Sequence, residues 1–271
     1  MRMVKIDPDK INMMPLILGP VQPERQKRVG SVYSEVEYVG LQYQTDPDAI
    51  RALLPDCYRP AEKPLVTVMF CYNNGVDFLA GRGYRVATVN VGARFDGVQD
   101  HVEGDYALMM LEDDATPIIT GREWLGVHKA FADISPVRTL PSGSLRCEAS
   151  LWGHMLFSAE LASPKEQNPI VRSLAAKEFN KRPMLGYKYI PCLDGPPDAS
   201  YPTMTPSELK LEQLWLGKSG EVFYVDAKEE DIGFMVRALD ALKTLPVGEV
   251  TQTVRLRGSS VLRTDLSRHL R

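Results

Sequence analysis

The sequence predicts an α+β fold in which a mostly antiparallel β-barrel or sandwich is flanked by a few helices. Three observations favour this class. Many short segments are rich in Val, Tyr, Leu and Ile, Gly or Pro stands in many of the gaps between them, and a long helical repeat is found only near the C-terminal end. Because many strands with few crossover helices pair mainly antiparallel, a barrel or a sandwich is the expected architecture.

The chain divides into a predicted extended arm, residues 1–30, and a single predicted domain, residues 31–271. The arm carries charges between several prolines, which is typical of an extended segment: Pro8, Pro15, Pro20 and Pro23. No break in composition and no internal repeat divides the rest of the chain. With 271 residues, 44% of them hydrophobic, the chain can bury one substantial core.

The elements of the domain are expected in the following order. A short helix begins after Asp46 as N-cap, with Pro47 at its first position, and Pro55 stops it. A long helix is predicted over residues 231–245, where apolar side chains recur at helical spacing. Strands are predicted at Val32–Tyr43, Leu65–Tyr72, Tyr84–Val91, Tyr106–Leu111, Leu145–Trp152, Met155–Leu161, Met184–Ile190, Leu209–Leu216, Glu221–Val225 and Glu249–Leu256.

Charge and apolar content exclude several classes of partner. Lys and Arg total 32 against 35 Asp and Glu, so the net charge of −3 gives no broad cationic surface for nucleic acid. The apolar stretch Met13–Leu18 is interrupted by Pro15 and is too short for a membrane span or a signal-peptide core. A cytoplasmic protein without a membrane partner is therefore expected. The cysteines form no CxxC pair, so they are expected to be reduced thiols.

Familiar cofactor and metal motifs are incomplete. Gly217-Lys218-Ser219 ends like a phosphate loop but lacks the earlier glycine, and the four histidines show no metal-ligand spacing. Glu112-Asp113-Asp114 suggests either a metal cluster or a solvated turn, and the solvated turn is favoured because apolar segments lie on both sides of it. No metal site is predicted.

One lysine stands in an unusually apolar stretch. Lys129 follows Trp124, Leu125 and Val127 and precedes Phe131. A lysine in such surroundings either extends its ammonium group to water or serves as a functional amine. Residue types alone do not decide between these interpretations.

The motifs around this lysine resemble those of the acetoacetate decarboxylase superfamily. They are Gly104-Asp105-Tyr106 with Met109-Met110, Gly121-Arg122-Glu123, and a lysine six residues after Glu123. The resemblance extends in collinear order over most of the chain, through Tyr43-Gln44-Thr45-Asp46, Arg182-Pro183, Ile190-Pro191, Asp194-Gly195 and Leu245-Pro246-Val247.

The resemblance implies a β-rich fold with a closed apolar pocket, a homo-oligomer, and a lysine that forms an imine with a ketone. Lys129 matches the Schiff-base position, and no metal or organic cofactor is implied. An ordinary lysine amine titrates near 10.4 and is almost entirely protonated at neutral pH. Burial and a neighbouring cation make such an amine nucleophilic, and acetoacetate decarboxylase is itself the known example of this activation.

The match departs from the decarboxylating members at several positions. There, proline precedes the Schiff-base lysine and a second lysine follows it, whereas here the neighbours are His128 and Ala130. Desolvation, together with His128 or Arg122, would have to replace the second charge. Val36 stands where the decarboxylases carry an arginine, and an ungapped comparison places Arg82 where they carry a glutamate.

These departures favour an enzyme that keeps the substrate carboxylate, because an arginine would hold that group. The preferred prediction is an aldolase-dehydratase that forms an enamine from a pyruvate-type 2-oxo acid. The alternatives are decarboxylation of acetoacetate or another β-keto acid, and a non-catalytic protein that binds an apolar ligand. The predicted substrate is a small oxo acid.

Each site residue has an assigned role and an alternative one. Lys129 is the imine-forming nucleophile, Arg82 the carboxylate binder, and Glu123 or His128 the proton shuttle. Alternatively, Glu123 and Arg122 form a structural ion pair, and Arg82 is a solvent-exposed loop residue. Four apolar candidates are interpreted either as pocket wall or as general core: Met109, Met110, Trp124 and Phe131. Arg122 is a further candidate for substrate binding.

Overall fold

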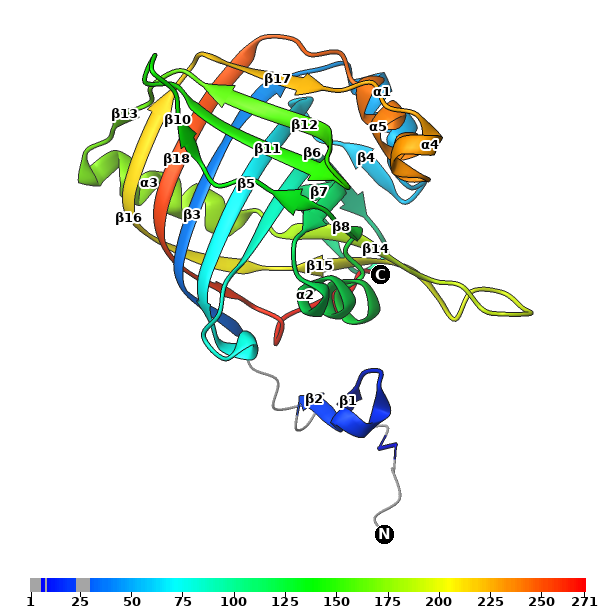
Figure 1. The fold of residues 1–271 in the computed structure, drawn as a ribbon. Coiled ribbons are helices and arrows are strands. Elements are labelled where there is room, and N and C mark those ends of the chain that lie inside the picture. Colours follow the sequence, from blue (N-terminus) through cyan, green and yellow to red (C-terminus); the bar gives the residue numbers. More distant parts are fainter. Residues whose placement is uncertain (1–5, 8, 23–29) are drawn as a thin grey trace.

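Two β-sheets packed face to face form the body of the molecule in the computed structural model, which describes residues 6–7, 9–22 and 30–271 (Figure 1). The larger sheet has the strand order β13 (Lys165–Glu166), β16 (Ser207–Gly217), β18 (Val250–Leu262), β3 (Ser31–Gln44), β5 (Leu65–Val76), β6 (Tyr84–Asp96), β7 (His101–Glu112), β14 (Met184–Ile190), β15 (Ala199–Thr205) and β19 (Arg268–His269). Beside this path, β4 (Tyr58–Pro60) pairs with β6, and β8 (Lys129–Phe131) pairs with β7. The smaller sheet contains β10 (Arg138–Thr139), β11 (Leu145–Leu151), β12 (His154–Leu161) and β17 (Gly220–Tyr224), with β9 (Asp133–Ile134) beside β11. Neither sheet closes on itself, so of the two expected architectures the sandwich is the one that forms.

All the predicted strands are present, several of them longer than expected. The bounds of β14 match the prediction, whereas β7 begins earlier and ends one residue later, at Glu112. Pairing in the larger sheet is antiparallel except where β7 meets β14 and β8, which run parallel to it. Strand β15 was not predicted because Pro202 interrupts its pattern.

The helices follow the prediction less closely. Helix α1 (Pro47–Leu53) is confirmed, and the Asp46 side chain accepts a hydrogen bond from the Asp48 amide. The single helix predicted over residues 231–245 is wrong. Gly233, at φ 57°, separates α4 (Glu229–Ile232) from α5 (Met235–Lys243). Helix α3 (Pro169–Lys181) was missed, since none of its residues is buried and its apolar stripe is weak.

Part of the predicted N-terminal arm is a small hairpin. Strands β1 (Ile11–Asn12) and β2 (Pro20–Gln22) pair antiparallel around the short 3₁₀ turn η1 (Leu16–Leu18). Residues 1–5, 8 and 23–29 of the predicted arm lie outside the described residues.

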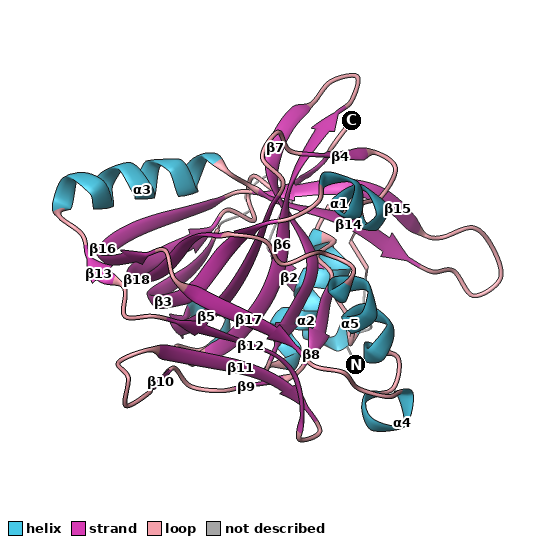
Figure 2. Ribbon diagram, turned by 90° about the horizontal axis from the view of Figure 1, so that it is seen from above, coloured by secondary structure: helices cyan, strands magenta, loops and turns pink. Residues whose placement is uncertain are grey.

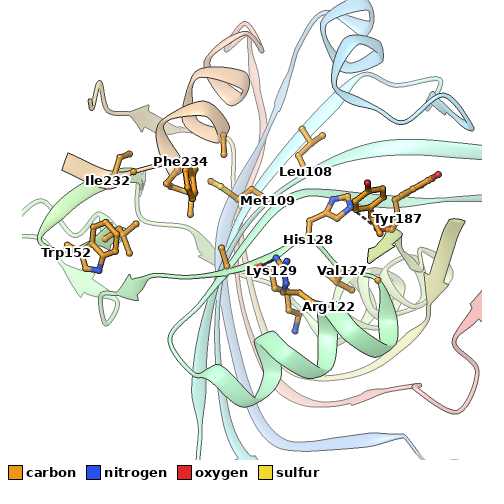
Figure 3. A pocket seen from close by; sticks show the side chains of 17 residues that line it. Leu108, Met109, Arg122, Val127, His128, Lys129, Trp152, Tyr187, Ile232 and Phe234 are labelled. Atoms are coloured by element: carbon orange, nitrogen blue, oxygen red, sulfur yellow. Dashed lines mark hydrogen bonds between the residues drawn. The ribbon is translucent and has the colours of Figure 1, made fainter. Parts of the chain in front are cut away.

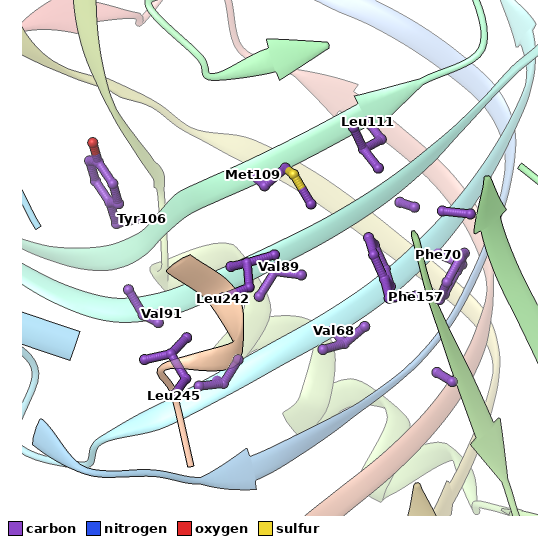
Figure 4. Close-up of a cluster of buried hydrophobic side chains, with 14 of the residues drawn as sticks. Val68, Phe70, Val89, Val91, Tyr106, Met109, Leu111, Phe157, Leu242 and Leu245 are labelled. Atoms are coloured by element: carbon purple, nitrogen blue, oxygen red, sulfur yellow. The ribbon is translucent and has the colours of Figure 1, made fainter. Parts of the chain in front are cut away.

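Two hydrophobic clusters lie on opposite faces of the larger sheet. The inter-sheet core fills the space between the sheets, where Phe70 of β5 packs against Phe157 of β12 (Figure 4). The second cluster lies on the other face of the larger sheet, and Phe179 of α3 packs against it. Figure 2 shows α3 beside β16. At the end of β7, Met109 and Leu111 belong to the inter-sheet core and Met110 packs against the second cluster, so the two faces of the strand meet different environments there.

Two further predictions concern the thiols and the membrane. The four cysteines are free, and Cys147 is buried. No helix among the described residues is long and apolar enough to cross a membrane.

Candidate active site

Strand β8 sets the direction of the Lys129 side chain. It runs parallel to β7, with Lys129 opposite Met110, and the Met110 amide donates a hydrogen bond to the His128 carbonyl. Partners in a parallel ladder project to the same face, and successive residues of a strand alternate between faces. Lys129 therefore leaves the sheet on the face of Met110 and Glu112, away from the inter-sheet core.

The amine of Lys129 is buried and held by two acceptors. Its Nζ donates to Oε1 of Glu112 at 2.6 Å and to the Pro117 carbonyl at 3.1 Å. Only 7% of Lys129 is exposed, so the alternative interpretation of an ammonium group extended to water is wrong. This nitrogen lies in the low-dielectric environment that the proposed chemistry requires.

Glu112 is the site residue that the sequence analysis missed. The interpretation of Glu112-Asp113-Asp114 as a solvated turn is wrong for its first residue, because Glu112 ends β7 and is 1% exposed. For Asp113 and Asp114 the interpretation as a solvated turn holds only in part, because both residues are half-buried. Asp113 accepts a hydrogen bond from the Arg85 amide, and Asp114 is the N-cap of α2 (Ala115–Thr120). The available signal was alternation along the strand, which places Glu112 on the same face as Met110.

Glu112 is only partly satisfied by its neighbours. Its Oε2 is buried and has no hydrogen-bond partner in the described part of the chain, while Oε1 accepts from Lys129. Burial raises the pKa of Glu112, and the positive charge of Lys129 opposes that rise. Such a carboxyl group can exchange a proton with its neighbour.

The Gly-Arg-Glu motif shapes the space around the lysine. Gly121 begins the π-helical turn η4 (Gly121–Leu125), and a Cβ atom there would lie 2.4 to 2.8 Å from the last three atoms of the Lys129 side chain. Any residue with a Cβ atom at position 121 would therefore overlap the Lys129 side chain. Arg122 also supports the lysine, since its Nη1 donates to the Lys129 carbonyl at 2.9 Å. Glu123 is half-buried, and no ion pair joins it to Arg122 among the residues described.

His128 is held by backbone carbonyls on both sides. Its Nδ1 lies 3.0 Å from the Ala107 carbonyl and its Nε2 lies 3.1 Å from the Tyr187 carbonyl. Burial lowers the pKa of this imidazole, although the two carbonyls oppose the shift. A ring fixed in this way positions the segment before β8, and it is poorly placed to shuttle protons.

The structure does not bring Arg82, Trp124 or Phe131 to the amine, whereas Met110 pairs with Lys129 in the strand register. Arg82 is exposed in the turn between β5 and β6. Phe131 is 46% exposed, and Trp124 packs against the small cluster around Leu125. Met110 is half-buried on the face of the lysine.

A cavity of about 620 Å³ lies at the edge of the sheet beside β8 (Figure 3). Its lining includes three of the predicted site residues, Arg122, His128 and Lys129. Its apolar walls come from β7 and β8, from β11 and the turn that follows it, and from α4, α5 and the residues between these helices: Leu108, Met109, Ala130, Leu151, Trp152, Ile232, Phe234, Met235 and Ala238. Met109 and Ala130 belong to the inter-sheet core, so they face away from Glu112.

The family model of acetoacetate decarboxylase (ADC) matches residues 13–263. The chain belongs to the acetoacetate decarboxylase family. It is 26% identical over 235 residues to acetoacetate decarboxylase 1 of Bradyrhizobium diazoefficiens, covering 83% of this chain and 82% of that protein. It is 25% identical over 237 residues to acetoacetate decarboxylase of Clostridium acetobutylicum, covering 83% of this chain and 84% of that protein.

Solved structures show the same fold. A structure of acetoacetate decarboxylase superposes with a TM-score of 0.75 at 20% identity, covering 98% of each chain. The enduracididine biosynthesis enzyme MppR complexed with pyruvate superposes with a TM-score of 0.70 at 16% identity, covering 98% of this chain and 99% of that one. The expected β-rich family fold is thus confirmed, and the family to which the chain belongs is one of lyases.

Proposed function

We propose that the protein is a Schiff-base lyase that decarboxylates a small 3-oxo acid, with Lys129 as the imine-forming amine. The observation that carries this proposal is the buried contact of 2.6 Å between Lys129 Nζ and Glu112 Oε1. It supports the proposal because, in a desolvated site, the amine would act as the nucleophile and the adjacent carboxyl group would exchange protons with it.

Glu112 supplies the proton transfers that imine chemistry needs. When it accepts the proton of the ammonium group, both side chains become neutral and the amine gains its lone pair. The amine then attacks the ketone carbon, and Glu112 returns the proton to the departing hydroxyl group, so that water leaves. The resulting iminium withdraws the electron pair of the carbon–carboxylate bond, and carbon dioxide leaves. Glu112, ionised after giving its proton to the departing water, takes up a proton from solvent and passes it to the enamine carbon. Hydrolysis of the imine then frees the ketone and the Lys129 amine.

The surroundings of the amine favour loss of the carboxylate over its retention. Both described partners of Nζ, Glu112 and the Pro117 carbonyl, are acceptors and repel an anion. A 2-oxo acid would place its carboxylate on the imine carbon, closest to these acceptors. A 3-oxo acid places it one carbon further away, and repulsion in the ground state is relieved when carbon dioxide leaves. The prediction that the enzyme keeps the substrate carboxylate depended on Arg82, which is exposed in a turn.

The proposal is tested by incubating the purified protein with acetoacetate or pyruvate and measuring carbon dioxide release and inactivation by borohydride. We expect carbon dioxide from acetoacetate and a reduced adduct that adds the mass of an isopropyl group. Lys129→Met is expected to lose both signals. Lys188→Met is the matched control, because Lys188 lies over the ring of Tyr201 and not beside Glu112.

Two other outcomes would overturn the proposal. A pyruvate adduct without carbon dioxide release from acetoacetate would favour the aldolase-dehydratase. No adduct with either acid would favour a non-catalytic binding protein.

A further inference from the structure

The lining of the cavity beside β8 carries the guanidinium of Arg122 and contains no Asp or Glu. The two other basic residues of the lining do not add to this charge, because burial lowers the pKa of the His128 imidazole and the Lys129 amine contacts Glu112. Arg122 is exposed at the edge of the cavity and forms no ion pair in the part of the chain that the structure describes. Its Nη1 donates to the Lys129 carbonyl, and its remaining N–H donors are available for a ligand. A guanidinium of this kind binds a carboxylate through strong, charge-assisted hydrogen bonds.

The opposite side of the cavity is apolar and unusually exposed. Trp152 is 70% exposed and Phe234 is 80% exposed, and Figure 3 shows both across the cavity from Arg122. Trp152 also has φ 52°, a left-handed conformation that is costly for a bulky residue. The turn between β11 and β12 therefore holds the Trp152 side chain beside the cavity at the cost of a strained backbone conformation.

The catalytic amine lies on the other face of the sheet. The cavity wall contains Met109 and Ala130, which belong to the inter-sheet core, whereas Lys129 Nζ and Glu112 lie on the face of Met110. Since neighbouring residues of a strand project to opposite faces, a ligand enclosed by Met109 and Ala130 is separated from the amine by the strands themselves.

We propose that this cavity is a second binding site, which takes an apolar monocarboxylic acid with a medium-length alkyl chain. Arg122 binds the carboxylate, and the alkyl chain lies between Met109, Trp152 and Phe234. A volume of about 620 Å³ is within the range of ordinary ligand sites, and apolar walls with a single charged group are their usual composition. The site does not depend on the imine chemistry proposed above.

The test is calorimetric titration of the intact protein with octanoate and, as a neutral match, octanol. We expect octanoate to bind about tenfold more tightly than octanol, since a charge-assisted hydrogen bond contributes that much or more. Arg122→Gln should remove this difference while leaving octanol binding unchanged. Ala238→Trp should weaken both ligands by filling the cavity.

Lys129→Met separates this site from the catalytic one. Octanoate binding that survives in Lys129→Met, while borohydride trapping is lost, supports two sites. Loss of octanoate binding in that variant would place the ligand at the amine and overturn the proposal. Equal binding of octanoate and octanol to the unmodified protein, or no binding of either, would also overturn it. These binding results do not test imine formation, which is measured separately by borohydride trapping.

Discussion

Gly121→Ala is the smallest change that tests how Lys129 is positioned. Gly121 has φ −66° and ψ −40°, so alanine suits its backbone and should favour the helical turn by about 1 kcal/mol. The added methyl carbon, however, would meet Lys129 Cε at 2.4 Å, Cδ at 2.5 Å and Nζ at 2.8 Å. Unstrained carbon contacts are about 3.5–4.0 Å, so the end of the side chain must move by roughly 1 Å.

That displacement sets the expected magnitudes. A misplacement of about 1 Å can cost about a hundredfold in rate, so borohydride trapping with acetoacetate should slow by about that factor. Overpacking costs about 1–3 kcal/mol, and the gain in helix propensity offsets part of it, so the free energy of unfolding should fall by roughly 0–2 kcal/mol. Denaturant unfolding and the trapping rate measure the two effects.

A Lys129→Ala background provides the control. The three atoms nearest to the added methyl group all belong to Lys129, so removing that side chain should turn Gly121→Ala from a destabilising into a neutral or stabilising change. A Gly121→Ala protein that is trapped at the unmodified rate would refute the reasoning. So would an equal stability loss in both backgrounds.

Three other perturbations test the neighbouring residues. Glu112→Gln keeps a hydrogen-bond acceptor but cannot exchange protons, so trapping and carbon dioxide release should fall by about a hundredfold or more; unchanged rates would contradict its role. Lys129→Met leaves Glu112 buried without its partner and should cost about 3 kcal/mol at pH 8. Because burial already raises the pKa of Glu112, that cost should shrink as the pH falls and the carboxyl group is protonated. A cost independent of pH would contradict this account. Burial lowers the pKa of His128, so the unfolded state binds the extra proton below about pH 6.5, and stability should decrease as the pH falls through that value, by at most about 1.4 kcal/mol per pH unit. His128→Asn should flatten that part of the stability curve, and an unchanged slope would exclude this imidazole as its cause.

The sequence predicted the strands well because their periodicity is local. Each strand of the sandwich carries its own apolar pattern, and Gly or Pro punctuates many of the gaps. The helices depended on less visible features. Gly233 divides an otherwise continuous helical repeat, and α3 has a good start signal in Asn168 and Pro169 but no buried residue.

The site could be predicted only where a motif lies close in sequence. Lys129 and the segment Gly121-Arg122-Glu123 were predicted as site residues because the spacing between them is short and specific. Glu112 was missed because three consecutive acids resemble a solvated turn, and only the register between β7 and β8 shows that the first of them is buried beside the lysine. Arg82 was placed by an ungapped comparison, but the hairpin between β5 and β6 carries it to the surface.

The most direct test of the imine mechanism is to locate the covalent adduct. After reduction with borohydride in the presence of acetoacetate, the protein is digested and its lysine-containing peptides are sequenced by mass spectrometry. We expect one isopropyl group, carried by Lys129 and absent from the Glu112→Gln protein over the same short reaction time. An adduct spread over surface lysines, or an unmodified Lys129 in a protein that still releases carbon dioxide, would contradict the mechanism.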